Sequence, residues 1–343
     1  MSGHFFAHAP VISWMTWMKR RIWSSENQEP HPLATELLQQ PIQSPTGIQP
    51  AICLEANALE YSQFFQQFFY ETNNPVTLII PATVLQAGIQ SGLIQGCEVR
   101  DSVKNLAGIV FCLFAGYYRQ QPVGLITWLC VHPSWRNKGI TNTLLRGIYK
   151  LAQPWKIHLW RNDGFLSSPA PPVWNEWRIV RKKQSARLTS QVLHTNLVAQ
   201  KVPHAKWRTF LMNDWVRANP TGVFLDHPTF PTRFVETYEF QLKTGVVGLI
   251  CVQPTFERER KTGAAWCEIL LWAFHGLSDA SSYSQSQYIE RMIDVLPYGW
   301  FEAPAAMPHL QDGWISSGQS SWSIFGLDPG IPVQRPILSL CAN

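Results

Sequence analysis

The residues best suited to chemistry form one continuous segment, WLCVHPSWRNKGITNTLL, at positions 128–145. Its apolar start is typical of a buried strand, and its last part has helical spacing. A short loop between a strand and a helix presents backbone N–H groups to an anion such as a pyrophosphate, which the helix dipole also favours. Gly139 permits a close backbone approach, and Arg136 and Lys138 add positive charge. An ordinary strand-to-helix turn with surface charges explains this pattern equally well.

The elements that must position this segment follow from the periodicity of the apolar residues. Before the loop we expect a helix over 54–71 and strands over 76–80, 106–117 and 122–131, with a less regular stretch between the first two strands. After the loop we expect a helix over 141–152, capped by Thr141 or Asn142, and a strand over 155–160. The basic run 178–187 is expected to be a solvated crossover between two halves, because most charge runs are exposed.

The second half of the chain repeats this rhythm of elements without a repeat of letters. We expect strands over 235–242, 245–252, 265–274, 299–303 and 321–327, and a helix over 284–296. Strands that alternate with helices indicate α/β units. The sequence therefore predicts an N-terminal arm over 1–50, one α/β half over 51–190 and a second over 191–343.

Composition excludes several classes of protein. The chain has 343 residues, of which 45% are hydrophobic and 15% charged, so it can bury a large core and general disorder is not expected. Sixteen Trp and 18 Phe favour broad aromatic packing or an apolar ligand groove. A net charge of +5 suits a polyanionic ligand but is too small and dispersed for a nucleic-acid footprint.

The seven cysteines are widely spaced and show no metal-ligand spacing, so we expect no metal and a reducing compartment, the cytoplasm. The N-terminus lacks the charge order of a secretory signal, because Lys19, Arg20 and Arg21 follow its apolar stretch. The longest apolar run, 107–118, is too short to span a bilayer. The aromatic opening, HFFAHAPVISWMTWMKRRIW, is compatible with an interfacial segment and transient membrane contact.

The loop resembles known acyltransferases. Arg136 to Thr141, RNKGIT, resembles the Arg/Gln-x-x-Gly-x-Gly/Ala motif of the Gcn5-related N-acetyltransferase superfamily, with Thr141 in place of the last small residue. The run Leu129 to His132, LCVH, is similar to the Phe-Leu-Cys-Val-His strand of protein N-myristoyltransferases. This run is the most specific match in the chain.

Weaker similarity to the N-myristoyltransferases follows in order along nearly the whole chain. The opening HFFAHAPV resembles the family's Gln-Phe-Trp-x-x-Gln-Pro-Val arm, and WRNDGFLSSPAPPVWNEWRIVRK resembles its Pro-rich, aromatic and Arg-Lys succession. Near the end, YGWFEAPAAM and SSGQSSWSIFGL are similar to a late segment and to the final strand of the family.

The resemblance implies two Gcn5-like halves around a mixed, saddle-shaped β-sheet, with acyl-CoA in the first half and the acceptor peptide in the second. The activity would be transfer of a myristoyl group from myristoyl-CoA, a co-substrate rather than a tightly bound cofactor, to the N-terminal glycine of proteins. A monomer is expected. The co-substrate would contact His4, Phe5, Phe6, Trp128, Leu129, Cys130, Val131, Arg136, Asn137, Lys138, Gly139, Ile140 and Thr141.

The resemblance also implies the catalytic groups. The backbone N–H groups of Trp128 and Leu129 fall at the family's oxyanion hole, and the terminal carboxylate on Asn343 would be the general base. Cys130 is not expected to be a nucleophile, because the amine attacks the thioester directly. His132 is a weaker alternative as base, since Pro133 directs the chain away.

Departures from the family's pattern keep two other functions open. Gly139 stands where the family has a second basic residue, which favours a tandem Gcn5-like N-acetyltransferase. Glu302, Ala305 and Ser317 fall where the family has an Asn and two acids that recognise the acceptor. Their absence favours a catalytically silent descendant that binds acyl-CoA or protein partners.

Overall fold

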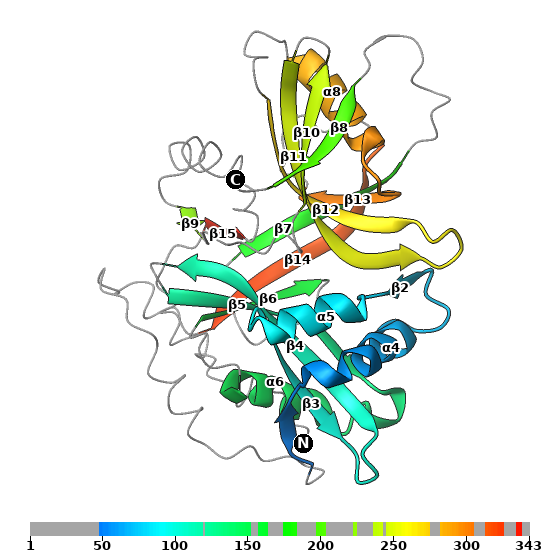
Figure 1. Ribbon diagram of the computed structural model, residues 1–343, viewed down its shortest axis with the longest axis vertical. Helices are drawn as coiled ribbons and strands as arrows, with labels where there is room; N and C mark the ends of the chain where they lie inside the picture. Colours follow the sequence, from blue (N-terminus) through cyan, green and yellow to red (C-terminus); the bar gives the residue numbers. More distant parts are fainter. Residues whose placement is uncertain are drawn as a thin grey trace. The chain divides into compact units, whose positions relative to one another are not determined.

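A computed structural model describes residues 48–118, 121–151, 157–163, 174–183, 197–203, 222–224, 236–242, 245–274, 282–304, 313–325 and 334–337 (Figure 1). The chain divides into two compact units. Unit 1 comprises 1–175, 223–225 and 321–336, and unit 2 comprises 176–222, 226–320 and 337–343. The predicted arm lies almost wholly outside the described residues, and the predicted boundary between halves stays a prediction.

Unit 1 contains the elements that the sequence places around the loop and further elements that it did not predict. In chain order they are β1 (Pro50–Ile52), the 3-10 turn η1 (Glu55–Asn57), α4 (Ala58–Phe68), β2 (Val76–Leu78), α5 (Ala82–Gln90), β3 (Ile94–Arg100), β4 (Leu106–Tyr118), β5 (Gln121–Val131), the 3-10 turn η2 (Pro133–Trp135), α6 (Ile140–Leu151) and β6 (Ile157–Asp163). The sheet order is β1-β3-β4-β5-β6. Neighbours from β1 to β5 pair antiparallel, whereas β5 and β6 are parallel because α6 crosses between them.

Helices cover both faces of the unit 1 sheet. Val110 of β4 packs with Leu144 of α6 in one buried core, whereas the ring of Phe111 lies 5.8 Å from the ring of Phe65 in α4. Successive side chains of a strand point to opposite faces, so α6 and α4 lie on opposite sides of the sheet. Each large apolar side chain buried in this way contributes about 1.5–3 kcal/mol.

Two glycines let α6 approach the sheet closely. A Cβ on Gly108 of β4 would lie 2.9 Å from side-chain carbons of both Ile140 and Leu144. A Cβ on Gly147 of α6 would lie 2.4 Å from Sγ of Cys97 in β3. The absence of side chains at these two positions therefore sets the distance of α6 from β3 and β4.

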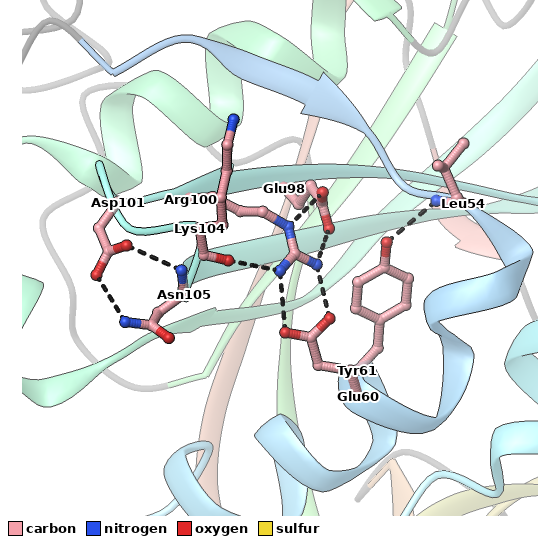
Figure 2. A network of polar contacts seen from close by, with 8 residues as sticks. All are labelled: Leu54, Glu60, Tyr61, Glu98, Arg100, Asp101, Lys104 and Asn105. Carbon is pink, nitrogen blue, oxygen red and sulfur yellow. Dashed lines mark hydrogen bonds and ion pairs between the residues drawn. The ribbon is translucent and has the colours of Figure 1, made fainter.

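A partly buried ion cluster fixes the other helix layer to β3. Figure 2 shows the guanidinium of Arg100 between the carboxylates of Glu98 and Glu60. Its Nη2 lies 2.7 Å from Oε2 of Glu60, and its Nε lies 2.8 Å from Oε1 of Glu98. Hydrogen bonds to both carboxylates raise the pKa of Arg100. Because Glu60 is in the first turn of α4 and Glu98 is in β3, the cluster anchors the start of α4.

The stretch between residues 80 and 106, which the sequence left less regular, contains α5 and β3. Both elements carry a glycine, which weakens the local signal for helix or strand. The glycines serve close packing instead: a Cβ on Gly88 would lie 2.3 Å from Cδ1 of Ile94, and one on Gly96 would lie 2.4 Å from the ring of Phe111. Tertiary contacts decide both elements.

Unit 2 contains a succession of elements like that from β3 to β6 of unit 1. Its described elements include β7 (Trp174–Lys182), β8 (Val198–Val202), β10 (Glu236–Leu242), β11 (Gly245–Glu259), β12 (Ala265–Phe274), α8 (Ser282–Val295) and β13 (Trp300–Pro304). The sheet order is β7-β13-β12-β11-β10-β8, with β12 and β13 parallel and the other neighbours antiparallel. The remaining strands are β14 (Ile315–Phe325) and the pair β9 (Gly222–Phe224) and β15 (Gln334–Ile337). The α/β class expected from the sequence is confirmed, and both units mix parallel and antiparallel strands.

The basic run 178–187 is not the solvated crossover that the sequence predicts, since its first five residues end strand β7. Arg178 is 2% exposed, and its Nη1 lies 2.8 Å from Oε1 of Glu268. Arg181 is 4% exposed and forms ion pairs with Glu290 and Asp294 of α8. The prediction fails because carboxylates about a hundred residues away in sequence compensate these charges.

The described residues contain no helix that is both long and apolar enough to cross a membrane. Six cysteines are buried, free thiols: Cys53, Cys97, Cys112, Cys130, Cys251 and Cys267. The seventh, Cys341, lies outside the described residues.

Candidate functional site

A β-bulge interrupts β5 at the point where the sequence places the reactive loop. Ile109 of β4 pairs with Cys130, and Phe111 pairs with Thr127, so Trp128 and Leu129 together oppose one residue of β4. Trp128 has a φ of 51°, in the left-handed region that a bulky side chain rarely adopts. A bulge of this kind breaks the regular ladder and redirects backbone groups. Strain of this sort is concentrated at functional sites.

The bulge follows directly on the end of the pairing between β5 and β6. The parallel register runs from Val123 opposite Ile157 to Ile126 opposite Trp160. Both strands continue beyond this point, β5 to Val131 and β6 to Asp163. The bulge of β5 therefore lies just beyond its register with β6.

Aromatic residues of two elements hold the side chain of Trp128. Its ring centroid lies 6.5 Å from that of Phe65 in α4 and 6.3 Å from that of Phe111 in β4, both at steep interplanar angles. Edge-to-face pairs of this kind add about 0.5–1.5 kcal/mol each beyond the burial of area. The strained conformation at Trp128 is thus supported from the side of α4.

The loop from His132 to Gly139 connects the bulge to α6 by a defined path. The N–H of His132 donates to the carbonyl of Ala107 at 2.9 Å, and the N–H of Ser134 donates to Nδ1 of His132 at 3.2 Å. Asn137 and Gly139 have φ values of 61° and 77°. Left-handed residues in such a turn bring successive N–H groups toward a common point, an arrangement that suits anions.

The loop ends at the N-terminus of α6, which begins at Ile140. Gly139 therefore holds the capping position, and the predicted caps Thr141 and Asn142 lie inside the first turn. The first helical hydrogen bond of α6 is made by the N–H of Thr143, which donates to the carbonyl of Gly139 at 3.2 Å. No acidic side chain occupies the first turn of α6. A helix start without its own anion favours a negatively charged ligand.

The two cations of the loop contact the protein itself. Nζ of Lys138 lies 4.9 Å from the ring centroid of Trp135. Nε of Arg136 donates to the carbonyl of Val131 at 3.3 Å, and its Nη2 donates to the carbonyl of Phe68 at 3.2 Å. Phe68 is the last residue of α4, so Arg136 joins the loop to the end of that helix.

The thiol of Cys130 has low reactivity in this environment. Burial raises the pKa of its thiol to about 12, against a small opposite effect of the Arg136 charge. The thiol stays protonated at neutral pH, and a protonated thiol is a poor nucleophile. The side chains of Cys130 and Ile140 are both buried, and Cys130 pairs with Ile109 of β4.

The structure brings together Trp128, Leu129, Cys130, Val131, Arg136, Asn137, Lys138, Gly139, Ile140 and Thr141, which the sequence predicts as one site. Their contact with a ligand stays a prediction. His4, Phe5, Phe6 and Asn343 lie outside the described residues. Within the described ranges, no group of three or more His, Cys, Asp or Glu side chains is arranged to hold a metal ion.

Sequence reasoning missed the supporting residues Phe65, Phe68 and Phe111. Their helical or strand spacing identified them as core, but no local signal connects them to the loop. The ring of Phe68 lies 4.5 Å from the ring of His132, across 64 residues of sequence. Contacts over such a distance appear only in the folded chain.

No protein-family model and no curated protein matches the sequence. Solved structures do match. The crystal structure of Saccharomyces cerevisiae N-myristoyltransferase with bound myristoyl-CoA aligns with a TM-score of 0.59 and 12% identity, over 95% of this chain and 93% of that one. The chain has the fold of that enzyme. A second structure of the yeast enzyme with myristoyl-CoA gives a TM-score of 0.57, 12% identity and coverage of 95% and 88%.

A Gcn5-related N-acetyltransferase from Anabaena variabilis aligns less well, with a TM-score of 0.44 and 15% identity over 80% of this chain and 72% of that one. This third likeness adds nothing to the conclusion from the first two. At 12% identity, the likeness to the yeast enzyme establishes the fold and leaves the activity to be argued from the site.

Proposed function

We propose that this protein is an acyl-CoA-dependent N-acyltransferase that transfers a myristoyl group to the N-terminal glycine of acceptor proteins. The observation that carries the proposal is the bulge at Trp128 and Leu129, directly followed by a left-handed loop and the start of α6. In chain order, these features supply donors for a thioester oxygen and then donors for a phosphate. The fold shared with an enzyme crystallised with myristoyl-CoA supports this assignment.

In the proposed reaction, the neutral amine of glycine attacks the thioester carbonyl, a C–N bond forms, and the C–S bond breaks with release of CoA as thiolate. Negative charge develops on the carbonyl oxygen during attack. The N–H groups of Trp128 and Leu129 are the proposed donors to this oxygen, and one such donor contributes about 3 kcal/mol. The terminal carboxylate of Asn343 is the proposed acceptor of the amine proton.

The length of the acyl group separates the proposal from an acetyl transfer. Burial of an acyl chain stabilises a complex by about 0.8 kcal/mol per methylene, so a site with an apolar groove binds a long chain far better than acetyl. An acetyltransferase lacks this dependence on chain length. Affinity across a series of acyl-CoA molecules therefore reports the substrate class.

The test is a turnover assay on the chain that ends at Asn343. The protein is incubated with myristoyl-CoA or acetyl-CoA and a peptide that starts with glycine, and free CoA is measured. We expect release of CoA with myristoyl-CoA, and no release with a peptide whose glycine amine is acetylated. A second sample with residues added after Asn343 is expected to bind acyl-CoA without turnover.

The outcomes separate the hypotheses. Turnover with acetyl-CoA alone would replace the proposal by an acetyl transfer. Binding of acyl-CoA without turnover in the native chain would make the protein a catalytically silent acyl-CoA binder. Full activity in the extended sample would exclude the terminal carboxylate as base and leave the transferase standing.

A further inference from the structure

The C-terminal end of α4 receives its capping interactions from distant parts of unit 1. The last carbonyls of a helix have no partner within the helix. The hydroxyl of Thr77 in β2 donates to the carbonyl of Gln66 at 3.3 Å, and Nη2 of Arg136 donates to the carbonyl of Phe68 at 3.2 Å. The last turn of α4 contains no basic residue of its own. Arg136 thus provides the positive charge that a helix C-terminus favours.

The same helix end contacts the loop a second time. The ring of Phe68 packs edge-on against His132 at 4.5 Å, and His132 in turn accepts a hydrogen bond from the N–H of Ser134. Nε of Arg136 also donates to the carbonyl of Val131, the last residue of β5. The loop is therefore joined to α4 through both a ring contact and a guanidinium that bridges two carbonyls.

The other end of α4 is fixed independently. Arg100 binds Glu60 in the first turn of α4 and Glu98 in β3, as Figure 2 shows. With its first turn tied to β3 and its last residue tied to the loop, α4 is a rigid support. Phe65 of the same helix packs against the strained Trp128. Both the bulge and the loop thus rest on α4.

We propose that Arg136 is a positioning residue, which holds the loop 132–139 against the end of α4, and that it does not bind the phosphates of acyl-CoA through its charge. The inference rests on the proposed acyl-CoA site. It assigns phosphate binding to the N–H groups of the loop and of α6, and it makes the geometry of the guanidinium essential. A lysine cannot replace it, because an ammonium on a flexible stem lacks the planar fork that bridges two carbonyls.

The first experiment needs no ligand. Amide hydrogen exchange is measured in the free protein for the wild type, for Arg136→Lys and for Lys138→Gln, which removes the cation of the same loop that lies over the ring of Trp135. We expect exchange across 132–139 to become about fivefold faster in Arg136→Lys, since lost hydrogen bonds to a charged group favour local opening. Lys138→Gln is expected to stay within about twofold of the wild type. Exchange in Arg136→Lys equal to that of the wild type would overturn the proposal.

The second experiment separates positioning from charge. The dissociation constant of myristoyl-CoA is measured against salt concentration for the wild type, Arg136→Lys, Arg136→Gln and Lys138→Gln. We expect about fivefold weaker binding in both Arg136 variants, with the salt dependence of the wild type, because salt screens a direct contact with phosphate and leaves a positioning effect unchanged. Wild-type affinity in Arg136→Lys, with a weaker salt dependence in Arg136→Gln, would identify a phosphate contact and sink the inference.

The two experiments keep the inference and the proposed function apart. A wild-type protein that binds no acyl-CoA would refute the proposed function and, with it, the role assigned to Arg136 at that site. A wild-type protein that binds acyl-CoA, together with unchanged exchange in Arg136→Lys, would refute the inference alone.

Discussion

Unit 1 and unit 2 share a succession of three antiparallel strands, a helix and a parallel strand, but the connections between these elements differ. In unit 1, three antiparallel strands, β3, β4 and β5, lead through α6 to the parallel strand β6. In unit 2, β10, β11 and β12 lead through α8 to the parallel strand β13. Both third strands have a bulge after the parallel pairing ends: Val252 pairs with Ile269 and Cys251 with Leu271, which leaves Leu270 as the extra residue of β12.

The connection after the bulge differs between the two units. In unit 1 it is a loop with Arg136 and Lys138 and two described residues of positive φ, after a bulge that itself contains the left-handed Trp128. In unit 2 the connection 275–281 reads HGLSDAS, without Lys or Arg. The connections of the two units therefore differ in charge, although the topology around them is alike. Fold and site are separate properties of this chain.

Among the described residues, the buried cations lie in unit 2 and not in unit 1. Unit 2 buries Arg178 and Arg181 against carboxylates of neighbouring elements. Unit 1 buries the neutral His158, and within the described structure neither of its ring nitrogens has a hydrogen-bond partner. Unit 2 thus buries two cations with their carboxylate partners, whereas unit 1 buries a neutral histidine and leaves Arg100, the cation of its ion cluster, partly exposed.

The largest effect is expected from breaking the ion pairs of unit 2. Arg181→Met leaves Glu290 and Asp294 without their buried partner, and we expect the free energy of unfolding to fall by about 3–5 kcal/mol in urea denaturation. The affinity for acyl-CoA, measured where the variant is folded, is expected to change by less than about twofold. Lys182→Met is the control, because Lys182 is half exposed and its loss is expected to cost far less. A loss in Arg181→Met as small as in the control would contradict the comparison.

Acid is expected to destabilise unit 1 because His158 is buried as a neutral group. Burial lowers the pKa of His158 to about 4, from an ordinary value of 6.5. Below pH 6.5 the unfolded chain binds a proton that the folded chain rejects, so stability present above pH 6.5 is lost as the pH falls toward 4. The shift corresponds to about 3 kcal/mol.

The measurement is urea denaturation at about pH 7, 5.5 and 4 for the wild type and His158→Leu, an interval that spans both pKa values of the group. The variant is expected to lose less stability than the wild type over this interval. Because the two proteins differ only at position 158, the difference is assigned to His158 in unit 1. Identical pH dependence in the two proteins would show that His158 is not buried as a neutral group.

The smallest effect on stability is expected from alanine substitutions at two left-handed glycines, one in each unit. Gly139 has a φ of 77° and Gly263 a φ of 73°, so alanine at either position introduces a similar backbone strain of about 1–2 kcal/mol. We expect a similar loss of stability in both variants. Only Gly139→Ala is expected to weaken myristoyl-CoA binding, by about tenfold, because it alone disturbs the start of α6. Equal affinities of the two variants for myristoyl-CoA would show that the loop does not contribute to acyl-CoA binding.

Much of the fold could be predicted from local signals. The strands around 106–117, 122–131 and 265–274 and the helix after the loop lie where apolar periodicity places them. These elements have strong patterns of their own, which tertiary contacts only have to preserve. The glycine-containing elements α5 and β3 and the charged strand β7 were missed because local composition points away from their true state.

The sequence by itself determined the elements with strong apolar periodicity, because that pattern is local. It also determined the continuous segment from Trp128 to Thr141, because all the residues of that segment are neighbours along the chain. Only the tertiary structure decided the left-handed conformation of Trp128, the burial of Arg178 and Arg181, and the attachment of Arg136 to the end of α4. Each of these depends on partners tens of residues away or more. Such partners come together only when the strands pair and the helices pack, and no local sequence pattern shows which distant residues will meet.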